Sequence, residues 1–103
     1  MTFFADLEIP HLAWVPRTDG GLDATHDHTH HFDDCVSGTT FRFFATIWNT
    51  EEGVPPWVTI DRAVVFRDGR CDRPDFPLFS FRASSVSNAK DEVARQIAMD
   101  CLP

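Results

Sequence analysis

The sequence lacks several features that would place it quickly in a class of protein. It has no glycine-rich phosphate loop, no G-x-S-x-G motif and no apolar run long enough to span a membrane. These absences argue against a P-loop protein, a serine hydrolase and a membrane protein. Tyrosine is absent as well, although ten phenylalanines and three tryptophans supply enough rings for a substantial core.

Positive charge is scarce in the first forty residues, where Arg17 is the only basic side chain besides histidine among seven acidic ones. The whole chain of 103 residues carries a net charge of −7 with histidine neutral. An acidic chain lacks the cationic surface that releases counterions from nucleic acid. Nucleic acid is therefore not the partner that the composition favours.

The three cysteines, Cys35, Cys71 and Cys101, are odd in number, far apart and without a C-x-x-C pair. No secretory signal precedes them, because the start of the chain has no basic region and Asp6 and Glu8 interrupt its apolar run. We therefore expect a cytoplasmic protein with reduced cysteines and no membrane partner.

Three segments are predicted to be β-strands of one compact domain. Residues 39–49, TTFRFFATIWN, alternate largely between apolar and polar side chains, and residues 57–66, WVTIDRAVVF, do the same. Asp68-Gly69 is a strong hairpin signal, and residues 77–83, PLFSFRA, supply the third strand after it.

Residues 87–103 form the clearest predicted helix, with an apolar stripe on one face and Asn88 or Ser87 as its cap. The predicted fold class is α+β, a three-stranded antiparallel sheet with a C-terminal amphipathic helix packed on one face. The acidic N-terminal extension, residues 1–40, is a candidate for one additional strand of this sheet.

Residues 24–35, ATHDHTHHFDDC, hold four of the five histidines and are predicted to form a loop. Three interpretations stay open. A zinc site would use His26, His28, His31 and Asp33, and a small cupin-like metal-dependent enzyme would use His26, His28 and Asp33. The second half of the cupin pattern needs another histidine, and none follows His31. The third interpretation is a solvated loop without a cofactor.

The segments NTEEGVPPWVTIDRAVVFRDG and SSVSNAKDEVARQIAMDCL together resemble the double-stranded-RNA-binding domain, over roughly residues 41–102. Glu52, Gly53 and Pro55 match the loop after the family's first strand. The positions that match its last helix are Ala89, Lys90, Val93, Ala94, Ile97 and Leu102. The family arranges a helix, three antiparallel strands and a second helix, so the resemblance implies a β-β-β-α domain over residues 41–103.

The sequence departs from the family where the family contacts RNA. The two leading lysines of the family's last helix are replaced here by Val86 and Ser87. Of the three lysines, only the third is kept, as Lys90. The family's loop histidine, which reaches the RNA minor groove, is missing here, since its position falls near Trp57 or Pro56. The resemblance therefore implies a non-catalytic interaction module that acts through protein–protein contact or as a homodimer. Weak binding of double-stranded RNA is the alternative, with Lys90, Arg95, Arg70 and Arg73 as contacts.

Overall fold

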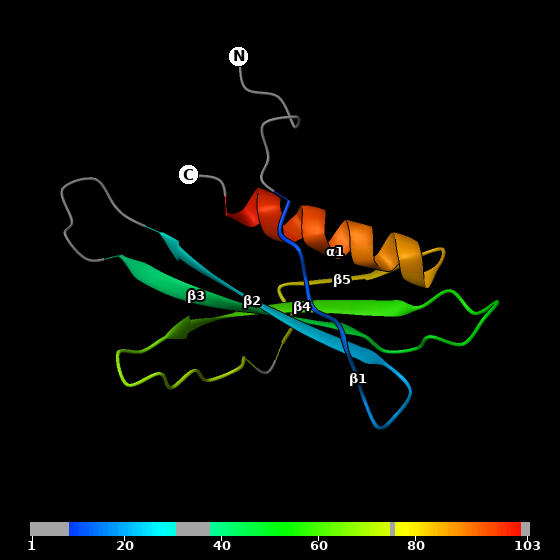
Figure 1. The fold of residues 1–103 in the computed structure, drawn as a ribbon, viewed down its shortest axis with the longest axis horizontal. Helices are drawn as coiled ribbons and strands as arrows, with labels where there is room; N and C mark the ends of the chain where they lie inside the picture. The colour runs from blue at the N-terminus through cyan, green and yellow to red at the C-terminus, as the bar shows by residue number, and fades with distance from the viewer. Residues whose placement is uncertain (1–8, 31–37, 75, 102–103) are drawn as a thin grey trace, which may run out of the picture.

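The computed structural model describes residues 9–30, 38–74 and 76–101. Five strands form one antiparallel sheet in which neighbours in the sequence are neighbours in space, in the order β1-β2-β3-β4-β5 (Figure 1). The elements are β1 (Val15–Pro16), β2 (Leu22–His30), β3 (Thr39–Ile47), β4 (Trp57–Val65), β5 (Phe79–Arg82) and α1 (Val86–Asp100).

The predicted number of strands, three, is wrong, because the sheet has five. The predicted segments contain β3, β4 and β5, and the predicted helix overlaps α1 from residue 87 onward, so the α+β class and the C-terminal helix are confirmed. β1 and β2 come from the N-terminal segment, and β2 pairs with β3 from Leu22↔Ile47 to His30↔Thr39. A division between residues 40 and 41 therefore cuts through β3, and the segment before it is part of the sheet.

The histidine stretch as far as His30 is a strand and not the predicted loop. Its H-x-H-x-H spacing places His26, His28 and His30 on one face of β2, because side chains alternate along a strand. His26 pairs with Phe43, and His28 pairs with Phe41. Pairing with this aromatic strand outweighs the weak strand propensity of the stretch itself. The remaining residues of the stretch, with His31 and Asp33, lie outside the described residues.

α1 packs across one face of the sheet, and the core lies between the two (Figure 1). The most buried large side chains of the core are Phe43, Ile47, Ile60 and Ile97. The helix adds Ala89 and Val93 from the apolar stripe that the sequence predicts. Burial of this apolar surface is what holds the helix on the sheet. We call the other face of the sheet the open face.

Both ends of α1 are fixed by side chains. Ser85 is the N-cap, since its hydroxyl accepts a hydrogen bond of 3.1 Å from the backbone N–H of Asn88. The predicted caps, Asn88 and Ser87, lie inside the first turn instead. Near the other end, Asp100 forms an ion pair with Arg62 of β4. In the described part of the chain, no helix is both long and apolar enough to cross a membrane.

The Asp68-Gly69 turn forms, but the hairpin that it closes is very short. Gly69 has a φ of 84°, and the backbone N–H of Phe66 donates to the carbonyl of Arg70 at 2.8 Å. After the single bridge between Val65 and Cys71 the chain leaves the ladder. A loop that contains two prolines then leads to β5, which pairs with the first half of β4.

Candidate functional site

β5 lies at one edge of the sheet, so one side of its backbone has no partner strand in the described structure (Figure 1). The N–H of Ala83 donates to the carbonyl of Pro56 at 2.9 Å and therefore points toward β4. Backbone groups alternate in direction along an antiparallel strand, so those of Ser80 and Arg82 point outward. We call this outer side of residues 79–82 the β5 edge. It offers donors and acceptors for one more strand.

At the opposite edge of the sheet, β1 is a poor template for pairing. β1 has only two residues, and the second of them, Pro16, has no N–H to donate. Short strands and prolines are common devices that keep a sheet edge from pairing with another chain. β1 pairs only with Leu22 and Asp23, however, so the outer side of β2 from Thr25 to Thr29 has no partner strand in the described structure either.

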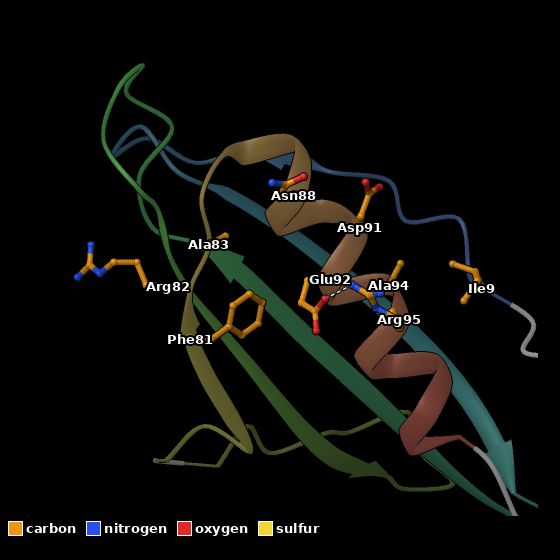
Figure 2. A pocket seen from close by; sticks show the side chains of 9 residues that line it. All are labelled: Ile9, Phe81, Arg82, Ala83, Asn88, Asp91, Glu92, Ala94 and Arg95. Atoms are coloured by element: carbon orange, nitrogen blue, oxygen red, sulfur yellow. Dashed lines mark hydrogen bonds and ion pairs between the residues drawn. The ribbon is translucent and has the colours of Figure 1, made fainter. Parts of the chain in front are cut away.

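A groove of about 690 Å³ lies beside the β5 edge, between β5 and α1. Figure 2 shows Phe81 projecting from β5 toward the helix, and Glu92 pointing from the helix toward Phe81. The lining residues are Ile9, Phe81, Arg82, Ala83, Asn88, Asp91, Glu92, Ala94 and Arg95. Apolar side chains of β5 and α1 thus share the groove with polar and charged ones, as expected of a protein-binding surface.

Charges of both signs lie at this groove. Glu92 accepts a hydrogen bond of 3.0 Å from the side chain of Gln96 and forms an ion pair with Arg95. These two contacts, the Gln96 hydrogen bond foremost, lower the pKa of Glu92, so that its carboxylate is ionised at neutral pH. Asp91 adds a second negative charge, whereas the guanidinium of Arg82 points away from the groove and stacks over Trp57 (Figure 2).

Large apolar side chains are exposed along the approach to β5. The side chain of Phe76 is 82% exposed, and those of Leu78 and Phe79 are about two-fifths exposed. Exposed apolar residues that stand close together in the chain mark a contact surface more often than isolated ones do. The β5 edge, the groove and these side chains form one continuous candidate interaction site.

The open face carries a second cleft, of about 290 Å³, beside Trp48. Trp48 directly follows β3, and its backbone N–H donates to the carbonyl of Trp57, the first residue of β4, at 2.9 Å. Arg17 stacks over the Trp48 ring at 4.6 Å and is held by Asp19 and Asp23. Because this guanidinium is already paired with two carboxylates, the cleft offers little net charge for a ligand.

The structure does not bring the four predicted RNA contacts together. Lys90 and Arg95 lie on α1, and Arg95 is paired with Glu92. Arg73 lies on the open face, where it is paired with Asp61, and Arg70 stacks over Phe66 in the turn region. Duplex RNA contacts phosphates along one continuous surface, and these residues occupy opposite faces of the sheet.

Two of the four predicted metal ligands lie side by side. His26 and His28 share the helix-side face of β2, whereas His31 and Asp33 lie outside the described residues. No group of three or more histidine, cysteine, aspartate or glutamate side chains close enough for a metal exists in residues 9–30, 38–74 and 76–101. Zinc binding by the predicted set therefore stays a prediction.

Comparison with protein families, with characterised proteins and with solved structures found no match to this chain. The resemblance of residues 41–102 to the double-stranded-RNA-binding domain therefore stays a prediction as well. In the described residues before β3, the structure has β1 and β2 at the place where that family has its first helix.

Proposed function

We propose that this chain is a non-catalytic interaction module that binds an extended segment of a protein as a sixth strand on β5. The observation that carries the proposal is the free β5 edge beside a groove with an apolar floor. Added strands gain affinity from backbone hydrogen bonds, while alternate side chains enter neighbouring pockets and supply specificity. On this chain, such side chains would meet Phe81, Ala83 and Ala94.

The exposed residues near the edge support the same proposal. Phe76 and Leu78 lie just before β5, where an added strand running antiparallel to β5 would continue past it. Covering these side chains removes apolar surface from water, which contributes about 25 cal/mol per Å². The proposal thus accounts for apolar exposure that the isolated domain leaves in contact with solvent.

A direct test uses a strand of known sequence as the probe. A fluorescent peptide of residues 77–84 of this chain, carrying two added lysines for solubility, is titrated with dilute protein and followed by anisotropy. We expect saturable binding with a dissociation constant below about 1 mM. A scrambled peptide is the control, and wild-type protein that binds neither peptide, or both equally, contradicts the proposal.

A pair of variants locates the site. Ser80→Pro removes an outward N–H from the β5 edge, and proline is tolerated on an edge strand where the N–H faces solvent. Ser80→Ala keeps the N–H and serves as the matched control. We expect Ser80→Pro to abolish peptide binding with circular dichroism unchanged, and Ser80→Ala to bind as wild type does.

A further inference from the structure

We infer that His26 and His28 of β2 form a two-histidine chelate for a divalent transition cation, with Cu²⁺ bound more tightly than Ni²⁺ or Zn²⁺. The inference goes beyond the proposed function, because β2 and β5 are not neighbours in the sheet. It follows from the alternation of side chains along β2, from the contacts that fix this alternation and from the unpaired side of the strand.

β2 holds the two imidazoles on one face at a separation suited to a single ion. Both side chains are partly buried, whereas the residues that alternate with them, Thr25, Asp27 and Thr29, are exposed. Residues two apart on a strand have Cα atoms about 7 Å apart. Each imidazole extends from its Cα toward the space between the two, where a zinc ion needs nitrogens at about 2.0–2.1 Å. One cation can therefore bind both rings.

Contacts on the opposite face of β2 fix the direction of the histidines. Asp27 accepts hydrogen bonds of 2.7 and 3.0 Å from Arg42, and the hydroxyls of Thr29 and Thr40 lie 2.7 Å apart. A shift of β2 by one residue would break both contacts and turn the histidines to the other face. The pairing with β3 thus orients the two imidazoles before an ion binds, which lowers the cost of binding.

The side of β2 that faces away from β3 gives an ion access to the histidines. β1 pairs only with Leu22 and Asp23, so no strand of the described structure lies beside β2 at His26 or His28. A hydrated cation can approach the imidazoles from this side. Its remaining coordination positions are then filled by water or by a donor atom of a bound molecule.

The strand supplies two ligands and not three. His30 shares their face, but its Cα lies about 13 Å from that of His26, too far for both to bind one ion. Within the part of the chain that the structure describes, no histidine, cysteine, aspartate or glutamate completes a group of three. His26 and His28 pair with phenylalanines of β3 inside the ladder, whereas His30 is its last position. The better fixed pair is therefore the first one.

The type of ligand selects the class of ion. Imidazole suits copper, nickel and zinc, and nitrogen ligands bind Cu²⁺ most tightly among the divalent ions of the first transition row. Magnesium and calcium take oxygen ligands. The carboxylate between the two histidines in the sequence, Asp27, lies on the opposite face and is paired with Arg42. The site therefore binds a transition cation and leaves Mg²⁺ in solution.

The experiment measures metal binding by whole chains that differ only in their histidines. Thiolates bind the same ions, so the parent chain and all variants carry three cysteine replacements, Cys35→Ser, Cys71→Ser and Cys101→Ala. A two-histidine chain keeps His26 and His28 alone and carries His11→Asn, His30→Asn and His31→Asn. Its matched counterpart carries His26→Asn and His28→Asn and keeps the other three histidines. Circular dichroism checks that both fold as the parent does.

Calorimetric titration with Cu²⁺ gives the affinity and the number of ions bound. We expect the parent and the two-histidine chain to bind one Cu²⁺ with a dissociation constant below about 100 μM. The counterpart should bind at least about 10-fold more weakly, because a chelate gains from the high effective concentration of its second ligand. Ni²⁺ and Zn²⁺ should bind more weakly than Cu²⁺, and Mg²⁺ should not bind.

The two ligands are then removed singly from the two-histidine chain. His26→Asn and His28→Asn should each weaken Cu²⁺ binding at least about 10-fold, since either change leaves a single imidazole. A single variant that binds as tightly as the two-histidine chain overturns the chelate. Loss of binding in the two-histidine chain overturns the inference, and so does a counterpart whose dissociation constant lies within about 10-fold of it.

Discussion

The carboxylate of Asp61 on β4 lies beneath the guanidinium of Arg73, whose Nε donates to Oδ2. The side chain of Asp61 is 7% exposed, and the Arg73 Cζ lies 5.2 Å from the centre of the Phe44 ring. This pair joins the loop between β4 and β5 to the open face. The path of that loop determines where β5 begins, so the pair contributes to the position of the β5 edge.

Removing Arg73 tests this relationship. Arg73→Ala leaves a buried carboxylate without its cation, and we expect it to lower the free energy of unfolding by about 2–3 kcal/mol. Urea denaturation measures the change. Asp61→Asn combined with Arg73→Ala should cost less than the sum of the single variants, because the second change removes the uncompensated charge. Arg67→Ala, on an exposed residue, is the control and should cost at most about 0.5 kcal/mol. An equal effect of Arg67→Ala and Arg73→Ala contradicts the prediction.

The pair between Asp27 on β2 and Arg42 on β3 makes stability depend on pH. The hydrogen bond from Arg42, at 2.7 Å, holds the pKa of Asp27 below its usual range. A lowered pKa in the folded state means that the stabilisation is present above the usual carboxyl pKa and is lost as the pH falls through the folded value. We therefore expect Asp27→Asn to be less stable than wild type at pH 7, by about 0.2–1 kcal/mol, and the difference to vanish near pH 2.

Denaturation of wild type and Asp27→Asn at several pH values measures this difference. Arg42→Gln is the matched control, since it removes the same hydrogen bonds from the other strand and should show the same dependence on pH. A difference between wild type and Asp27→Asn that is constant from pH 7 to pH 2 would rule out the pair as its source.

The strands that sequence predicted correctly are those whose side chains specify them locally. β3 and β4 combine alternation with aromatic and β-branched residues, and α1 has a continuous apolar stripe. β2 has no such signal, because its histidines are polar and its apolar residues stop at Ala24. Its structure comes from pairing with β3, and pairing between segments cannot be read from either segment alone.

The candidate site was harder to predict than the fold for a related reason. The residue types of the histidine cluster are by themselves enough to suggest a metal site. An edge strand has no such mark, since being an edge depends on the order of strands in the sheet. The sequence did show β5 and its prolines, but only the five-stranded order leaves the outer groups of Ser80 and Arg82 without a partner strand.

The start of α1 gives a prediction that distinguishes the structure from the sequence pattern. Ser85 caps the helix through its hydroxyl, whereas the pattern favours Asn88 or Ser87. Replacing an N-cap serine with alanine typically costs about 1 kcal/mol. We expect Ser85→Ala to cost that much in thermal or urea denaturation, and Ser87→Ala, within the first turn, to cost less than about 0.5 kcal/mol. A larger cost for Ser87→Ala than for Ser85→Ala would place the N-cap at Ser87, as the sequence pattern predicts.

Gly21, just before β2, is required by the close approach of two strands. A Cβ added there would lie 2.5 Å from the carbonyl oxygen of Ile47, a backbone atom of β3 that cannot move without disturbing the ladder. Gly20→Ala is the control, since its Cβ meets nothing within 4 Å and the cost comes only from a φ of 93°. We expect Gly21→Ala to lower the free energy of unfolding by about 2–3 kcal/mol and Gly20→Ala by about 1–2 kcal/mol. Urea denaturation of both variants measures the two costs. A larger loss of unfolding free energy in Gly20→Ala than in Gly21→Ala would show that backbone conformation, and not contact with β3, is what requires glycine in this turn.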